Sequence, residues 1–186
     1  MHTFRSMVLV ACAYCLFSTV TAVAESHVAP EYIGVIAARD PKTGDYVDLE
    51  RLTPATETKL RFLGFGGGRS ELYYLGDKSP VRFRAGQSVE FVLRVERQDI
   101  DPQSLIQFWI LDSDSSNGRR VLPMQDVASF VSVNARNESQ THQVAFRASK
   151  MGSNFFVFKP AEPLAPGEYS VSTTGDKDGF NFGVDP

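Results

Sequence analysis

The stretch Leu164-Ala165-Pro166-Gly167-Glu168-Tyr169 decides the predicted fold. Proline presets φ and glycine accepts a bend, so this pair is expected to end a connection. From Glu168 to Thr174 the side chains alternate between two faces, which predicts a strand with Tyr169 on its inner face. The tyrosine ring would then lie in the interior, with its hydroxyl group hydrogen-bonded back to the bend.

A second alternating strand follows at the end of the chain, after a polar turn. We predict a hairpin in which Thr174 pairs with Gly179, which places Val171 opposite Phe182. Because side chains alternate with a period of two, a one-residue slip would turn every inward side chain to the wrong face. The inward set is Tyr169, Val171, Thr173, Phe180, Phe182 and Val184.

The run Pro166-Gly167-Glu168-Tyr169 before a strand resembles the corner of immunoglobulin-like sandwich domains, including fibronectin type III-like ones. The whole chain also resembles uncharacterised bacterial secreted or periplasmic proteins that end in the same strand. This resemblance implies an all-β fold, an immunoglobulin-like antiparallel β-sandwich with extra N-terminal β-hairpins. It implies no activity, because one fold supports many functions.

The position of Trp109 also resembles that of the core tryptophan in immunoglobulin-like domains. It lies in the apolar run from Leu105 to Leu111, one strand after the predicted central strand. We therefore expect Trp109 in the core, although a single tryptophan in a secreted domain can also sit in a glycan-binding site. The absence of a cystine departs from the antibody type and leaves only the wider architecture.

Residues 1–24 predict a secretory signal. Arg5 supplies the positive start, Met7 to Phe17 is apolar, and an A-x-A site predicts cleavage after Ala24. The apolar run is too short to span a membrane. The sequence around Cys12 resembles a lipoprotein box, but apolar residues continue past it, so we do not expect lipidation. We expect a secreted or periplasmic protein with no membrane span.

The composition limits the class of partner. The chain carries 19 Lys and Arg against 22 Asp and Glu, a formal net charge of −3. A mildly acidic chain does not favour nucleic acid or anionic lipid as the main partner. Both cysteines, Cys12 and Cys15, lie in the predicted signal, so we expect no disulfide and no thiolate metal site in the mature chain.

We expect one compact unit after removal of the signal. Residues 25–79 would supply N-terminal strands and a hairpin extension, with a loose lead from Glu25 to Glu31 and a strand from Tyr32 to Ala38. Residues 80–186 would supply the immunoglobulin-like sandwich. Gly and Pro recur at the spacing that is typical of short strands in a sandwich or barrel.

The pattern from Val81 to Val95 predicts a hairpin and the central strand. Apolar and charged residues alternate on both sides of the turn Gly86-Gln87-Ser88, a recognised hairpin length. If Ala85 pairs with Val89, two phenylalanines meet inside and Arg84 meets Glu90 outside.

The same hairpin predicts a surface site. Arg82, Arg84 and Arg94 should project from neighbouring strands on one outer face. Arginine in such a position binds carboxylates or sulfated and phosphorylated glycans. The alternative is ordinary cross-strand ion pairing with Glu90 and Glu96.

Two glycine-containing segments raise the question of a cofactor or a metal. The segment Gly64–Arg69 lacks the glycine spacing and the lysine of a P-loop, so we expect a flexible loop or bulge. The segment Asp112–Gly118 places glycine one residue too late for an EF-hand loop. An Asn-Gly hairpin turn at Asn117-Gly118 explains the same residues, so we expect neither cofactor nor metal.

We predict a protein without enzymatic activity. The carboxylate pairs lie in turns, where Asp makes local hydrogen bonds. His27 lies in the loose lead, and His142 sits at the start of a predicted strand with no acidic residue or second histidine nearby. The first hypothesis is a secreted or periplasmic module that binds a protein or a cell-envelope component such as a glycan. The alternatives are a periplasmic inhibitor or immunity protein, with Gly64–Arg69 or Asp112–Gly118 as its probe, and a hydrolase with dispersed carboxylates.

Overall fold

The computed structural model describes residues 29–40, 42–60, 68–127, 135–136 and 138–186 of the 186-residue chain. The predicted signal at residues 1–24 and residues 64–67 of the predicted loop Gly64–Arg69 lie outside these ranges. Within them, no helix is both long enough and apolar enough to cross a membrane.

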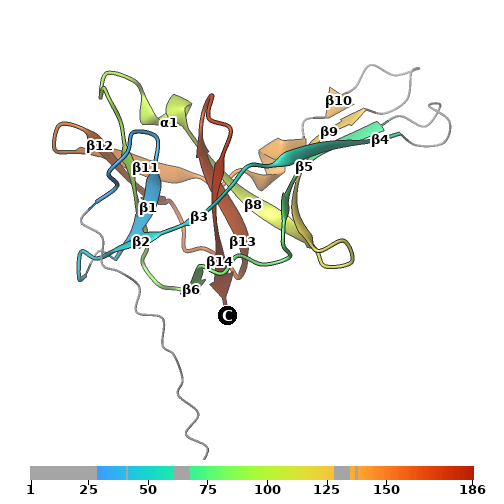
Figure 1. Cartoon of the computed structure of the whole chain (residues 1–186), viewed down its shortest axis with the longest axis horizontal. Coiled ribbons are helices and arrows are strands. Elements are labelled where there is room, and N and C mark those ends of the chain that lie inside the picture. The colour runs from blue at the N-terminus through green and yellow to red at the C-terminus, as the bar shows by residue number, and fades with distance from the viewer. Residues whose placement is uncertain (1–28, 41, 61–67, 128–134, 137) are drawn as a thin grey trace, which may run out of the picture.

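The chain forms two mostly antiparallel β-sheets (Figure 1). The first has the order β11-β12-β7-β1-β2, from β11 (Phe146–Met151), β12 (Phe155–Pro160), β7 (Glu90–Arg94), β1 (Ile36–Arg39) and β2 (Tyr46–Asp48). The second has the order β3-β14-β13-β8-β9-β5-β4, from β3 (Glu50–Leu52), β14 (Gly179–Asp185), β13 (Gly167–Thr173), β8 (Ile106–Asp114), β9 (Arg119–Val127), β5 (Gly68–Leu75) and β4 (Ala55–Leu60).

Shorter elements complete the fold. Strand β6 (Arg82–Arg84) pairs in parallel with β14, and β10 (Ala135–Arg136) pairs with β9. A one-turn helix α1 (Pro102–Leu105) and a 3-10 helix (Glu138–His142) lie in connections. The predicted all-β class therefore agrees with the structure, and the predicted central strand, β7, lies in the middle of the first sheet.

The core lies between the two sheets and is built largely from aromatic rings. Phe91 of β7 and Phe158 of β12 enter it from the first sheet, with ring centroids 5.4 Å apart. Phe182 of β14 enters from the second sheet and lies 5.0 Å from Phe91. All three side chains are fully buried, and each contributes about 1.5–3 kcal/mol of hydrophobic free energy before entropy is counted.

The corner at Tyr169 has the predicted geometry. The ring stacks on Phe182 in the core at a centroid distance of 5.4 Å, and the hydroxyl group donates a hydrogen bond of 2.8 Å to the Ala165 carbonyl oxygen. Burial raises the pKa of the Tyr169 hydroxyl above its usual range, so the donor keeps its proton. The predicted bond back to the bend is therefore confirmed.

The closing hairpin has the predicted face and a different register. Tyr169 pairs with Phe182 and Val171 pairs with Phe180, two residues away from the predicted pairing. The pairing of β13 with β14 ends at Val171, whereas on its other edge β13 pairs with β8 from Glu168 to Thr173, which lies opposite Ile106. A shift of two preserves the inward face, because the side-chain period is also two.

The predicted hairpin between Val81 and Val95 is wrong. Strand β6 pairs with β14 in the second sheet, with Phe83 opposite Val184, while β7 pairs with β1 and β12 in the first. The turn at Gly86 therefore carries the chain from one sheet to the other, with a φ of +77° at the glycine. Phe83 still packs against the core, so the alternation predicted the inward side chains correctly.

The expectation that Trp109 lies in the core is also wrong. Phe108 occupies the core position of β8 and is fully buried, so its neighbour Trp109 points to the opposite face. There Trp109 is half-buried and packs with Tyr74, Leu111 and Leu122 in a second, smaller apolar cluster.

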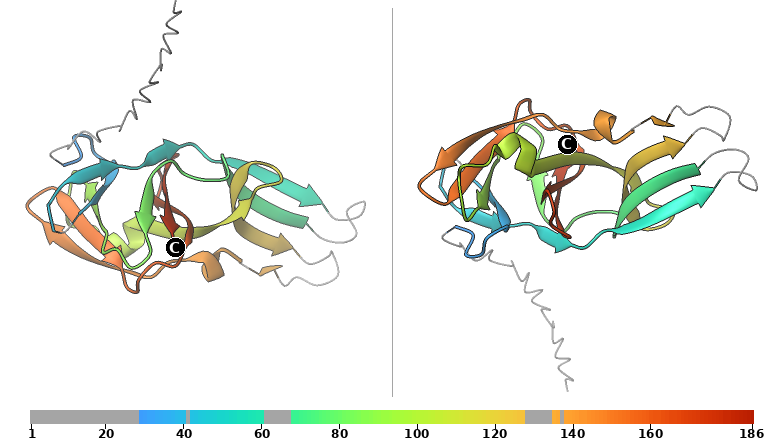
Figure 2. Two further views of the ribbon diagram at one scale, coloured as in Figure 1. Left: turned by 90° about the horizontal axis from the view of Figure 1, so that it is seen from below. Right: turned by 90° about the horizontal axis from the view of Figure 1, so that it is seen from above.

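This second cluster joins a projecting part of the second sheet to the rest. Strands β9, β5 and β4, which we call the arm, extend to one side of the two facing sheets (Figures 1 and 2). The β8–β9 hairpin forms its base, and its turn ends at Gly118 with a φ of +60°, as the Asn117-Gly118 pair predicts. Asp114 accepts hydrogen bonds from the side chains of Ser116, Asn117 and Arg119, which hold the pKa of its carboxyl well below the usual range.

The arm meets the outer face of β13 and β14 through buried polar groups. Arg120 of β9 has no exposed surface and donates to the Glu50 carboxylate at 2.7 Å and to the carbonyl oxygens of Gly76 and Leu75. Glu168 of β13 lies 4.0 Å from the same guanidinium group.

Further buried contacts continue along this outer face. Glu168 accepts from Arg82 and from the Ser79 backbone amide, and Ser170 donates to the Tyr74 hydroxyl at 3.1 Å. We call Arg120, Glu50, Glu168 and Arg82 together the polar seam.

The hydroxyl group of Tyr169 provides a test of the corner. Tyr169→Phe removes its bond and leaves the Ala165 carbonyl without that donor, so we expect the free energy of unfolding to fall by about 1 kcal/mol. Tyr32→Phe, at a side chain that is 68% exposed, should change it by less than about 0.3 kcal/mol. Urea unfolding measures both, and equal small effects would contradict the role given to the corner.

Candidate functional site

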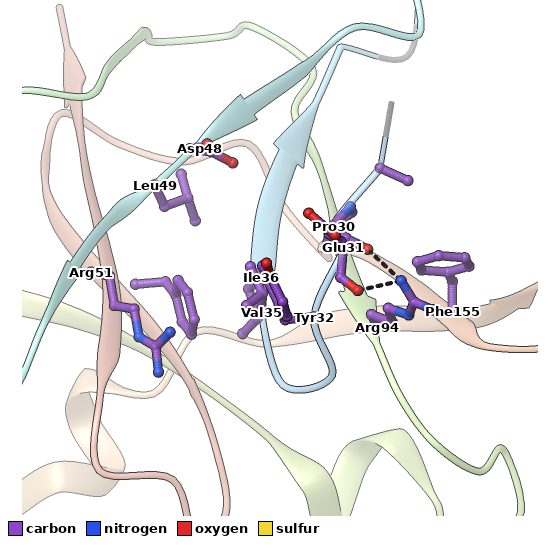
Figure 3. A pocket seen from close by; sticks show the side chains of 12 residues that line it. Pro30, Glu31, Tyr32, Val35, Ile36, Asp48, Leu49, Arg51, Arg94 and Phe155 are labelled. Carbon is purple, nitrogen blue, oxygen red and sulfur yellow. Dashed lines mark hydrogen bonds between the residues drawn. The ribbon is translucent and has the colours of Figure 1, made fainter. Parts of the chain in front are cut away.

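A hollow of about 730 Å³ opens beside β1, between the N-terminal segment and the crossing from β2 to β3 (Figure 3). Its apolar lining comes from Val35 and Ile36 at the start of β1 and from Leu49 between β2 and β3. Two Arg side chains, each next to a phenylalanine ring, lie on its opposite sides. The lining residues are Ala29, Pro30, Glu31, Tyr32, Val35, Ile36, Asp48, Leu49, Arg51, Arg94, Phe155 and Phe180.

Arg94 of β7 fixes one side of the hollow. Its Nη1 donates to the carbonyl oxygens of Pro30 and Glu31, and its guanidinium carbon lies 5.8 Å from the centroid of the Phe155 ring (Figure 3). The Gly34 amide also donates to the Arg94 carbonyl oxygen at 2.9 Å. The expectation of a loose lead is therefore wrong for Pro30 and Glu31, which Arg94 holds against the sheet.

Arg51 of β3 forms the other side. Its guanidinium carbon lies 5.7 Å from the Phe180 ring centroid, and its Nε donates to Asp178 at 2.6 Å. Thr53 donates to the same carboxyl, and these two hydrogen bonds lower the pKa of Asp178 because they favour its charged form. About half of the Arg51 side chain remains exposed, which leaves it accessible to a ligand.

A turn with exposed apolar side chains borders the hollow. Tyr32 is 68% exposed and Ile33 is 63% exposed, and Gly34 closes the turn with a φ of +83°. Ile33 also lines a second hollow of about 220 Å³, together with Ile100 and Arg94. We call the turn Tyr32–Gly34 with the two hollows beside it the Tyr32 surface.

The Tyr32 surface combines two kinds of chemistry. Its apolar side chains and aromatic rings favour contact with apolar groups, and its guanidinium groups favour a carboxylate beside them. The other large apolar side chains that are exposed among the described residues, Leu75 and Met124, lie on the arm. The Tyr32 surface thus gathers three of these exposed side chains, Tyr32, Ile33 and Ile100, in one region.

The three predicted surface arginines do not share one face. Arg82 and Arg84 lie on β6 in the second sheet, and Arg94 lies on β7 in the first. Arg82 pairs with Glu168 and Asp185, while Glu90 pairs with Arg39 at 3.4 Å rather than with Arg84. A binding role for Arg82, Arg84 or Arg94 stays a prediction, and the shared face expected for them is wrong.

Only some of the carboxylates predicted in turns make local hydrogen bonds, because Asp112 lies within β8 and Asp178 accepts from the distant Arg51 and Thr53. Asp101 accepts from the Gln103 amide at 3.0 Å at the start of α1, and Asp176 accepts from the Lys177 amide at 2.7 Å. His142, which has no acidic neighbour in sequence, lies with Nε2 3.3 Å from Asp112. Within the described ranges, no three His, Cys, Asp or Glu side chains come close enough to hold a metal ion.

Sequence reasoning missed the Tyr32 surface for an identifiable reason. The apolar residues from Tyr32 onward predicted a strand, but β1 begins only at Ile36 and Gly34 turns the preceding residues outward. The glycine two residues after Tyr32 was the available signal for a turn.

Comparison with known proteins identified no relative of this chain. No protein-family model matches the chain, no curated protein matches it, and no solved structure matches its fold. Its functional interpretation therefore depends on the geometry of its own residues.

The role of Arg94 in holding the Tyr32 surface is testable by hydrogen exchange. Arg94→Gln removes the charged donor to the Pro30 and Glu31 carbonyls, so we expect the Gly34 and Val35 amides to exchange about tenfold faster. Arg84→Gln, at the exposed end of β6, should leave both rates unchanged. Equal rates in the two variants would show that the segment is held without the arginine.

Proposed function

We propose that the chain is a secreted or periplasmic binding module without enzymatic activity, which recognises a protein of the cell envelope through the Tyr32 surface. In this proposal the two sheets are an immunoglobulin-like sandwich, and the strands before residue 80 add to both of its sheets. The bond from Tyr169 to Ala165 and the aromatic core between the sheets support that assignment.

One observation carries the proposal: exposed apolar side chains gather where two hollows adjoin. Tyr32, Ile33 and Ile100 are each exposed by about half or more. Exposed apolar side chains that gather in one region are typical of interaction sites on proteins, and Tyr and Arg are enriched in the energetic centres of interfaces.

The chemistry of the surface defines the partner. The apolar lining at Val35, Ile36 and Leu49 accepts an apolar side chain, and Arg51 or Arg94 beside it pairs with a carboxylate. The expected ligand is a polypeptide segment with an apolar residue next to an acidic one.

A second candidate, a periplasmic inhibitor or immunity protein, is favoured by the projecting arm (Figure 2). The described residues Gly68 and Arg69 of one predicted probe begin β5, while the other probe ends at Gly118, next to Arg119, which pairs with Leu75 at the end of β5. Eight residues of strand separate them by about 25 Å. An inhibitor would therefore insert one of these loops, Gly64–Arg69 or Asp112–Gly118, into a partner's cleft.

Substitution of one exposed apolar residue on each surface distinguishes the two candidates. The tagged full chain is produced with its own predicted signal and recovered with its partners from envelope extract. Ile33→Asp should lower the recovery of the main partner at least tenfold, because it places a carboxylate in the apolar contact. Leu75→Asp, at a side chain that is 73% exposed on the arm, should change it less than twofold.

The reverse result would favour the inhibitor hypothesis. Partner loss with Leu75→Asp and retention with Ile33→Asp would place the contact on the arm. Equal recovery with the original chain and both variants would contradict a contact at the Tyr32 surface. A photo-crosslinker at position 32 then identifies the partner peptide, and we expect an acidic residue within it.

A further inference from the structure

Strand β4 forms the outer edge of the arm. It pairs with β5 along Ala55 to Leu60, and within the described part of the chain no other strand lies on its second side (Figure 2). An edge strand offers a row of backbone amide and carbonyl groups that another strand can pair with. The side chains of this edge decide which strand fits.

The charges of β4 are complementary to those of the same strand running in the opposite direction. Glu57 and Lys59 share one face of β4, and their side chains are 41% and 48% exposed. In an antiparallel pair related by a two-fold axis, residues of the same parity lie opposite each other. When Thr58 lies opposite Thr58, each Glu57 lies opposite Lys59 of the second copy.

The neighbouring registers of the same parity are unfavourable. Shifting the pair in one direction places Glu57 opposite Glu57, and shifting it in the other places Lys59 opposite Lys59. Like charges directly opposite destabilise a sheet, whereas opposite charges contribute roughly 0.2–1 kcal/mol per pair. The charge pattern therefore selects a single register.

We propose that β4 pairs antiparallel with β4 of a second copy of this chain, about a two-fold axis at Thr58. The arms of the two copies then join into one continuous sheet. This proposal does not depend on the function of the Tyr32 surface, which lies before β1 and beside β3 and β7, away from β4.

Contacts within each arm hold the charged side chains in place for this pairing. Glu57 accepts from Arg119 at 2.6 Å, and Lys59 donates to Glu71 at 3.1 Å. Their exposed fractions leave room for a second partner across the interface. The strand is short and stable interfaces bury about 1,200–2,000 Å², so we expect a weak dimer with a Kd of about 0.1–1 mM.

Cysteine cross-linking tests the register. In a chain whose Cys12 and Cys15 are replaced by serine, Thr58→Cys places two thiols directly opposite each other, with Cα atoms about 4.5–5.5 Å apart. That separation suits a disulfide, whose Cα atoms lie about 4.4–6.8 Å apart.

Thr56→Cys is the matched control, because Thr56 lies on the same face of the same strand and is exposed like Thr58. Its two copies would be four residues apart along the strands, about 13 Å. Under mild oxidation we expect a covalent dimer from Thr58→Cys, at least tenfold more than from Thr56→Cys. Equal yields would indicate random collision or another register and would overturn the proposal.

Charge reversal gives an independent readout by sedimentation equilibrium. Glu57→Lys and Lys59→Glu should each weaken self-association at least threefold, because each places like charges opposite each other. A mixture of the two variants should associate, since each then supplies the charge that the other lacks. If the original chain, both variants and their mixture all stay monomeric at 1 mM, Lys59 protects a free edge and the proposal is wrong.

Discussion

The rest of the structure depends on the burial of the β13–β14 hairpin on both of its faces. The inner face is apolar, with Tyr169, Val171 and Phe182 in the core between the sheets. The outer face is also buried, but it carries Glu168, Ser170 and Asn181. Buried polar groups need partners, so this face requires the arm and the segment before β6 to cover it and supply hydrogen bonds.

Two glycines make that cover possible. A side chain at Gly179 would collide with the Tyr74 hydroxyl, and one at Gly183 would collide with the Arg82 guanidinium group. Because glycine has no side chain at these two positions, Ser170 can donate a hydrogen bond to Tyr74, and Arg82 can reach Glu168. Gly179 and Gly183 of β14 therefore allow the arm and the segment around Arg82 to pack closely against this strand.

The polar seam sets the position of the arm by charge and geometry. Removing a charged group from water costs several kcal/mol, and a buried pair regains this only when its hydrogen bonds are well satisfied. Arg120 meets that condition with the Glu50 carboxylate and the carbonyl oxygens of Leu75 and Gly76. The seam therefore disfavours other placements of the arm, even where its net contribution to stability is small.

The sequence predicted which side chains point into the core more accurately than it predicted which strands pair with each other. The two-residue alternation identified the inward side chains of β7, β13 and β14, and the corner and the Asn117-Gly118 turn were predicted from local chemistry. Alternation carries no information on which strand lies alongside, so the β6–β7 hairpin was wrong and the β13–β14 register differed by two. Trp109 was misplaced because its neighbour Phe108 satisfies the same pattern with the opposite parity.

The candidate site was less predictable, because it depends on contacts between distant segments. Arg94 was singled out from the sequence, but its contacts with Pro30 and Glu31 bring together residues more than sixty positions apart. Arg51 reaches the same hollow through a crossing between sheets at Leu49 that no local pattern indicates.

A double-mutant cycle on Glu50 of β3 and Arg120 of β9 tests most directly whether the polar seam holds the arm against the rest of the second sheet. The free energy of unfolding is measured for the original chain, Glu50→Gln, Arg120→Met and the double variant. The buried contact predicts a coupling energy of about 2 kcal/mol or more, with the double variant less destabilised than the sum of the single ones. A coupling energy within about 0.5 kcal/mol of zero would show that the two residues act independently and would contradict this account.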